Sequence, residues 1–171
     1  MSVLEYIYPE HPHRLTTATV SAAFERAAPK VTLEWEHRPR AVPAWSAVTV
    51  AHPRPPKVRS VFVVARNSAA QKRDLATRYE GDANLAAVLS TPVLIWSQLR
   101  VPLSTPLAAI PPAFDLHYAL LAAISGAGGG VVDLPENERL YSVEGFRRHA
   151  KRLTRRRSRP GRRVGRTKPS R

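Results

Sequence analysis

The sequence predicts an α+β fold in which a mixed or antiparallel sheet is covered by helices, and three patterns support it. Residues 31–37, VTLEWEH, alternate apolar and polar side chains, which is typical of a half-solvated, antiparallel strand. Residues 58–65 are almost continuously apolar, as in a strand buried on both faces. Residues 115–124 carry apolar side chains at helical spacing. The sixteen prolines cluster between such segments, which favours a loop-rich α+β chain over a helical bundle.

The first half of the chain opens with a predicted strand over residues 3–8. Thr16 or Thr17 can cap a helix whose apolar stripe ends before Pro29, because a hydroxyl oxygen accepts from free amides of the first turn. The strand over residues 31–37 follows, and residues 44–51 form the next one.

After the apolar strand over residues 58–65, Ser68 can cap a second helix that ends before Gly81. A short helix over residues 82–89 and a strand over residues 93–96, or slightly beyond, come next. The resulting order, β-α-β-β-β-α-β, is one strand away from the split β-α-β arrangement, so a ferredoxin-like sheet is one possible outcome.

The last third begins with a proline-rich segment, about residues 101–113, which we expect to be a surface linker within a single domain of residues 1–157. Asp115 then follows two prolines and is the expected N-cap of a helix. Two short strands around a turn at residues 135–137 should follow, and Ser142 should cap the final helix.

The glycines of residues 126–130, GAGGG, are expected to end the helix that precedes them. A phosphate-binding loop has the opposite polarity, because there the glycines follow a strand and open a helix whose amides meet the phosphate. The helix-ending interpretation is therefore favoured over a nucleotide site.

The pattern of alanine-rich helix, paired glycines, short strand, turn and Tyr-Ser helix start resembles the C-terminal part of uncharacterised bacterial α+β domains, some of them presumed immunity proteins of toxin systems. The resemblance covers about a fifth of the chain. It implies a binding protein rather than an enzyme, and it assigns no functional residue. The matching positions are residues 119–123, Gly129, Gly130, Val131, Asp133, Tyr141, Ser142 and Phe146.

The net charge of +14 is concentrated at the C-terminus. Residues 151–171 contain eleven of the 27 basic residues and no acid, so the first 150 residues are close to neutral. Residues 158–171 are expected to be a disordered basic tail, because they contain too few apolar side chains to offset chain entropy. Cations on such a segment bind polyanions by releasing counterions, without sequence preference. The candidate polyanion-binding residues are Arg147, Arg148, Lys151, Arg152, Arg155, Arg156, Arg157, Arg159, Arg162 and Arg163.

The histidines are not predicted to form a metal site or an acid–base site. His11 and His13 would project oppositely from an extended loop, and no third ligand follows at a standard spacing, so we expect a surface loop and no metal site. His37 and His52 each lie at a strand end and are interpreted as ordinary boundary residues. His117 lies near Asp115, but capping already accounts for that carboxylate.

Other candidate side chains also have ordinary structural roles. Asp133, Glu136 and Glu138 should be solvated on a tight turn, and the three tryptophans, which fall in predicted strands, should belong to the core. The chain has no cysteine, which excludes disulfides and thiolate chemistry and fits a reducing compartment.

The N-terminus lacks a basic region like that of a secretory signal, and the uninterrupted apolar runs are shorter than the ~18 residues of a membrane span. We therefore expect a cytoplasmic chain without a transmembrane segment or a cofactor. The favoured function is a non-enzymatic, immunity-like module that binds an unknown protein partner and carries a cationic tail. Two alternatives remain: non-specific nucleic-acid binding through the arginine-rich C-terminus, and an enzyme whose site is assembled from distant residues.

Overall fold

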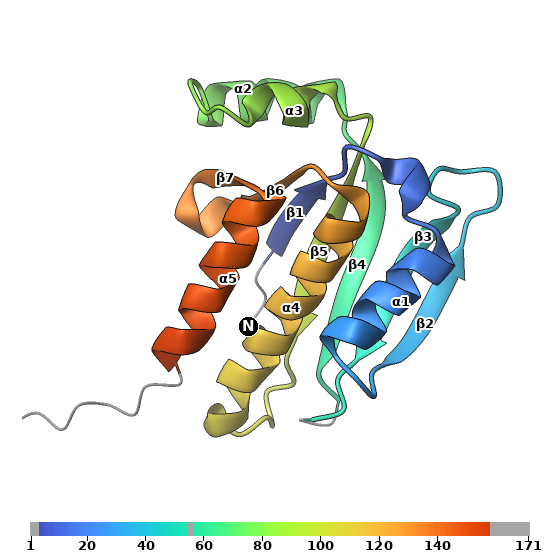
Figure 1. The fold of residues 1–171 in the computed structure, drawn as a ribbon, viewed down its shortest axis with the longest axis vertical. Helices are drawn as coiled ribbons and strands as arrows, with labels where there is room; N and C mark the ends of the chain where they lie inside the picture. The colour runs from blue at the N-terminus through green and yellow to red at the C-terminus, as the bar shows by residue number, and fades with distance from the viewer. Residues whose placement is uncertain (1–3, 55–56, 158–171) are drawn as a thin grey trace, which may run out of the picture.

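A computed structural model describes residues 4–54 and 57–157, which form one seven-stranded antiparallel sheet with helices on both of its faces (Figure 1). Along the sheet the strand order is β2-β3-β4-β5-β1-β6-β7. The strands are β1 Leu4–Tyr8, β2 Thr32–His37, β3 Trp45–Ala51, β4 Arg59–Arg66, β5 Val93–Arg100, β6 Val131–Leu134 and β7 Arg139–Ser142. The predicted α+β class is confirmed, and the sheet is antiparallel throughout.

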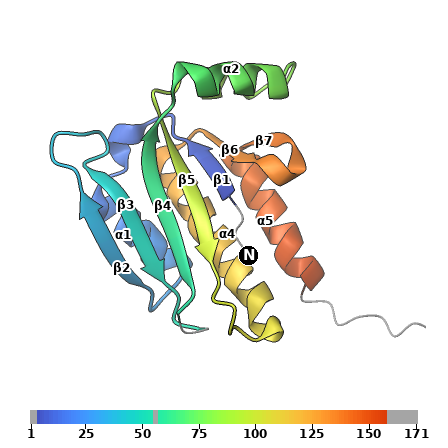
Figure 2. The ribbon, with the colours of Figure 1, turned by 180° about the vertical axis from the view of Figure 1, so that it is seen from behind.

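Three helices, α1, α4 and α5, cover one face of the sheet, whereas α2 and α3 pack against one end of the opposite face (Figures 1 and 2). Figure 2, seen from behind, shows the strands in front and much of this second face without a helix over it. The helices are α1 Thr17–Ala27, α2 Ala69–Arg78, α3 Leu85–Ser90, α4 Ile110–Gly128 and α5 Val143–Arg157. Three single turns of 3-10 helix are η1 Pro12–Arg14, η2 Leu107–Ala109 and η3 Pro135–Asn137.

The strand order differs from that of a ferredoxin-like sheet. A split β-α-β unit places one strand between the two strands that its helix connects, whereas β3, β4 and β5 all lie between β1 and β2. The strand β5, predicted over residues 93–96 or slightly beyond, runs to Arg100, because it pairs with β4 along its full length. The sequence pattern thus identified the strands but not their neighbours.

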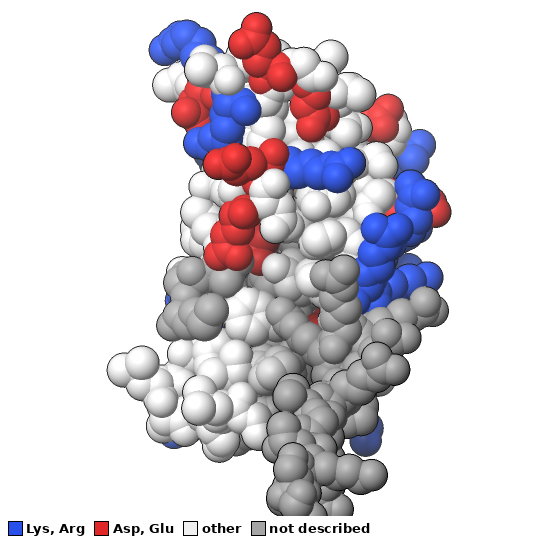
Figure 3. Space-filling model, turned by 90° about the vertical axis from the view of Figure 1, so that its left-hand side faces the viewer, with Lys and Arg blue, Asp and Glu red and all other residues white. Residues whose placement is uncertain are grey.

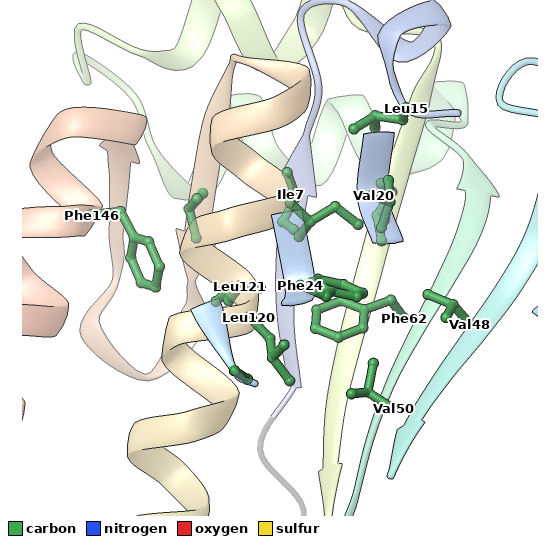
Figure 4. Close-up of a cluster of buried hydrophobic side chains, with 14 of the residues drawn as sticks. Ile7, Leu15, Val20, Phe24, Val48, Val50, Phe62, Leu120, Leu121 and Phe146 are labelled. Atoms are coloured by element: carbon green, nitrogen blue, oxygen red, sulfur yellow. The ribbon is translucent and has the colours of Figure 1, made fainter. Parts of the chain in front are cut away.

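The main core lies between the sheet and the layer of α1, α4 and α5 (Figure 4). Phe24 of α1 and Phe62 of β4 lie at its centre, with 5.2 Å between their ring centroids. Trp45 is fully buried, and its indole Nε1 donates to the carbonyl oxygen of Leu15 at 2.7 Å. The core prediction is confirmed for Trp45, whereas Trp35 and Trp96 are only half-buried.

Several helix ends follow the predicted chemistry. Thr16 caps α1, Ser68 caps α2, and the Ser142 hydroxyl accepts from the amide of Gly145 at 3.1 Å at the start of α5. The glycine run ends α4, since Gly129 and Gly130 adopt φ angles of 68° and 97°. Local sequence signals were sufficient at these positions because the capping partners lie within three residues.

The start of α4 was predicted wrongly. The helix begins at Ile110, so Pro111 and Pro112 lie inside its first turn and Asp115 is not its N-cap. Proline is tolerated there because the amides of the first turn have no partner within the helix. The last residues of the expected linker, 101–113, are therefore helical.

The helix α4 is also the most apolar element of the fold. Residues 107–128 are long and apolar enough to cross a membrane by length and composition, and about a third of the most apolar window is buried. In this fold the buried positions of α4, among them Leu120, Leu121 and Ile124, pack on the sheet. Leu116, Ala122, Ala123 and Ala127 of α4 are only partly buried and pack against the same core.

Candidate functional site

A chain of buried polar side chains lies between the sheet and α4. It joins Glu5 of β1, Ser60 of β4, Ser97 of β5, His117 of α4 and His52, which follows β3. Each is at most 5% exposed, in a region that is otherwise apolar. A buried group of this kind requires hydrogen-bond partners, and the chain supplies them.

The strand register brings these residues together. Glu5 and Ser97 are paired across β1 and β5, and Ser97 is also paired with Phe62 of β4, two residues from Ser60. All three polar residues therefore point to the same face of the sheet. His117 reaches them from the helix that covers this face, because it occupies the inward stripe of α4, three residues before Leu120.

The distances describe one continuous hydrogen-bonded path. Ser97 Oγ lies 2.9 Å from Glu5 Oε2, and His117 Nε2 lies 3.1 Å from the same oxygen. His117 Nδ1 lies 2.8 Å from Ser60 Oγ, which in turn lies 2.7 Å from His52 Nε2.

One assignment of protons satisfies every link when both imidazoles are neutral. The Glu5 carboxylate accepts from the hydroxyl of Ser97 and from Nε2–H of His117. The Ser60 hydroxyl donates to Nδ1 of His117 and accepts from Nε2–H of His52. The two ends of the path, Glu5 Oε1 and His52 Nδ1, have no hydrogen-bond partner.

The order of groups, carboxylate, imidazole and hydroxyl, is that of a catalytic triad, but the geometry does not present a nucleophile. Ser60 and His117 are both 0% exposed, and the Ser60 hydroxyl is already held by two histidines. Acyl transfer needs a substrate carbonyl within reach of that oxygen. What the chain can do is hold the sheet and α4 in one arrangement and orient the Glu5 carboxylate.

Burial, together with the nearby His117 and Arg59, lowers the pKa of His52 to about 4. In the unfolded chain a histidine has a pKa near ~6.5, so only the unfolded state takes up this proton between about pH 6.5 and pH 4. His52 therefore contributes stability that is complete above pH 6.5 and is lost as the pH falls toward 4.

We expect the unfolding free energy to drop by about 1–2 kcal/mol between pH 7.5 and pH 5 through this group. Urea unfolding of the wild type and of His52→Gln at both pH values measures the contribution. Gln keeps a donor for Ser60 but does not titrate, so its pH dependence should be smaller by that amount. An unchanged pH dependence in His52→Gln would contradict the assignment.

A second polar cluster attaches α2 to the opposite face of the sheet. The Tyr79 hydroxyl donates to Asp133 Oδ1 at 2.5 Å, and Gln71 Nε2 donates to the hydroxyl of Tyr8 at 3.4 Å. Burial raises the pKa of Asp133, and burial together with the Asp133 carboxylate raises the pKa of Tyr79. The prediction that Asp133 is solvated on a turn was wrong: it is 1% exposed, because its position in β6 turns it toward α2.

The predicted polyanion-binding residues lie on α5 and beyond it. Arg147, Arg148, Lys151 and Arg152 are exposed. Residues 155–157 form the last turn of α5, without a description of their side chains, and Arg159, Arg162 and Arg163 fall outside the described residues, as does the predicted tail at 158–171. Figure 3 shows the side of the molecule that carries α5. Lys and Arg gather along its right-hand edge, and others lie among Asp and Glu in the upper half.

The histidines fall into two groups. His11 and His13 lie in or beside η1, with ring centroids 5.7 Å apart, and His37 is exposed at the end of β2. Among residues 4–54 and 57–157, no group of three or more potential ligands could hold a metal ion. His52, in contrast, is buried and hydrogen-bonded, so its interpretation as an ordinary boundary residue was wrong.

Two shallow grooves run along the outer side of the helical layer. One, of about 420 Å³, lies between α1 and α4, and the other, of about 490 Å³, lies between α4 and α5. Their shared floor includes Ala119 and Ala122, and Arg147 borders both. The guanidinium of Arg147 lies so close to Gly126 that a Cβ there would collide with it. The grooves therefore have an apolar floor and a cationic rim.

A third, smaller cavity of about 190 Å³ lies between α4, α5 and the segment that follows β6. It is lined by Leu4, Glu5, Tyr118, Leu134, Pro135, Glu136, Asn137, His149 and Leu153. One end of the buried hydrogen-bonded chain, Glu5, therefore borders a cavity.

Comparison with protein-family models, with curated proteins and with solved structures found no match for this chain. The resemblance to immunity-like domains thus stays a prediction.

Sequence reasoning did not assemble the Glu5–His117–Ser60–His52 chain, although three of its members left a signal. Glu5 shares a strand face with Ile7, Ser60 interrupts an apolar run, and His117 is three residues from Leu120 on the helix stripe. A polar side chain at an inward position is such a signal. The partners, 112 residues apart for Glu5 and His117, could not be paired without the fold.

Proposed function

We propose that this chain is a non-enzymatic, cytoplasmic protein-interaction module, of the immunity-like kind, which docks a partner on the outer side of its helical layer. The observation that carries the proposal is the pair of grooves along α4. They expose small apolar side chains over an extended area, and exposed apolar patches on soluble domains are typical of interaction sites.

The borders of the grooves indicate the partner's chemistry. Arg26, Arg147 and Lys151 border them, and Asp115 also lines the groove between α4 and α5. Alanines on the floor allow a helix backbone to approach closely, as in helix-in-groove recognition. An amphipathic helix with an apolar stripe and predominantly acidic flanks fits both the floor and the rim.

We expect Ala122→Glu to weaken partner binding by about tenfold or more, because it places a charge on the apolar floor of both grooves. The partner is captured with the full-length chain from its native host, identified by mass spectrometry and titrated as a purified protein by calorimetry. Arg147→Glu should weaken binding as well, through the cationic rim.

The matched control for charge is Arg73→Glu, on the exposed side of α2 and away from the grooves, which should bind like the wild type. Equal affinities for Ala122→Glu, Arg73→Glu and the unmodified chain would refute the proposal.

A second candidate function is sequence-indifferent polyanion binding, favoured by the exposed cations Arg148, Lys151 and Arg152 of α5. In the same experiment it predicts nucleic acid in the captured material. It also predicts release by nuclease or moderate salt and no sensitivity to Ala122→Glu.

A further inference from the structure

The cavity beside Glu5 has the features of a small binding site. It is bounded by the ends of β1 and β6, by Tyr118 of α4 and by His149 and Leu153 of α5. Its volume of about 190 Å³ suits a ligand of a few non-hydrogen atoms. The cavity is separate from the two outer grooves, although Tyr118 borders one of them as well.

Glu5 lines this cavity, and one oxygen of its buried carboxylate has no hydrogen-bond partner. Its Oε2 accepts from both Ser97 and His117, whereas Oε1 is buried and has no hydrogen-bond partner. Most buried polar atoms in proteins are hydrogen-bonded, and an unpaired carboxylate oxygen is costly. Among the described residues, side-chain atoms of His52, Asn67 and Asp133 are also unpaired, but only Glu5 also lines one of the cavities described above.

The lining favours a cation over an anion. Among the described residues it includes two acidic residues, Glu5 and Glu136, and neither lysine nor arginine. Burial, together with the charges of Arg152 and Arg139, lowers the pKa of His149, so its imidazole is neutral near pH 7. Tyr118 adds an aromatic side chain to the lining, and aromatic rings attract cations, while the leucines at the lining can contact a short alkyl chain.

We propose that this cavity binds a small primary alkylammonium ion, which donates an N–H hydrogen bond to Glu5 Oε1. Ser97 and His117 donate hydrogen bonds to the other oxygen, Oε2. These bonds orient the carboxylate before the ligand binds. A short alkyl chain packs along Leu134 and Leu153. This ligand site is independent of the protein-docking surface proposed above.

Butylammonium is the probe, titrated into the full-length ¹⁵N-labelled chain while amide and imidazole resonances are recorded. We expect saturable shifts at Asn137, at His149 and at the imidazole of His117, which touches the same carboxylate. Tetramethylammonium has the charge but no N–H donor and should bind several-fold more weakly. Butyrate, similar in size but anionic, should produce no saturable shift.

Two variants locate the site. Glu5→Gln should reduce butylammonium affinity by about tenfold or more, since it removes the charged acceptor. Asn137→Trp changes an exposed residue at the cavity, so the fold is retained while the cavity is obstructed, and it should abolish binding. Glu34→Gln, exposed on β2 at the far edge of the sheet, is the matched control and should bind like the wild type.

The proposal is overturned if the wild type shows no saturable shifts with butylammonium. It is also overturned if butyrate binds equally well, or if Asn137→Trp binds like the wild type. If Glu5→Gln does not fold, the Asn137→Trp result and the His117 resonance in the wild type decide the question.

Discussion

Replacing Gly130 by Ala should lower the unfolding free energy by at least about 4 kcal/mol, one of the two largest losses we expect from a single substitution. Gly130 has a φ angle of 97°, a conformation that L residues rarely adopt. A Cβ at this position would overlap the carbonyl oxygen of Tyr8 and the amide nitrogen of Glu10. Both are backbone atoms in or next to β1, the strand between β5 and β6, so they cannot move without disturbing the sheet.

Gly81→Ala is the matched control, because Gly81 has a similar φ of 83° but nothing within 4 Å of the added Cβ. It should therefore lose only the backbone strain, about 1–2 kcal/mol. Guanidinium unfolding followed by circular dichroism measures both losses. If the two variants lose similar amounts of unfolding free energy, close packing against β1 is not the reason why position 130 requires glycine.

The other large effect concerns the buried hydrogen-bonded chain. His117→Leu should lower the unfolding free energy by about 3–5 kcal/mol, because it leaves the Glu5 carboxylate buried with Ser97 as its only side-chain donor among the described residues. The substituted side chain retains much of the volume, so the loss reflects mainly the unpaired charge. The measurement is again equilibrium unfolding in denaturant near pH 7.

A double-mutant cycle separates the pair from the packing. In Glu5→Leu/His117→Leu the charge and its partner are both removed, and such replacements can be close to neutral. We expect the double variant to be about 2 kcal/mol more stable than the sum of the single losses predicts. Additive losses would mean that Glu5 and His117 do not depend on each other. His37→Ala, at an exposed position, should change stability by no more than about 0.5 kcal/mol.

Local signals in the sequence identified elements but not their arrangement. The caps at Thr16, Ser68 and Ser142 were predicted because a cap and its amides are adjacent in the chain. The start of α4 was missed because prolines are compatible with a first helical turn as well as with a linker. Because Asp115 was interpreted as a helix cap, it was not predicted to pair with His117. The hydrogen-bond partner of His117 is Glu5, in the first strand.

The candidate ligand site was even less accessible to sequence reasoning. Its lining comes from β1, α4, the segment after β6 and α5. Nothing local marks Glu5 as more than one polar position in a short strand. Its free oxygen follows from where Ser97 and His117 lie in space, as does its position beside the cavity.

By itself, the sequence determined the alternation of strands and helices, the ends of most of them, and the concentration of positive charge toward the C-terminus. These features depend on side-chain periodicity, on capping within three residues and on composition, all of which are local. Only the tertiary structure decided the strand order, the burial of Asp133 and His52, and the hydrogen bonds of His117 with Glu5 and Ser60. The physical reason is that register and packing connect residues up to 112 positions apart, and local preferences do not specify such pairs.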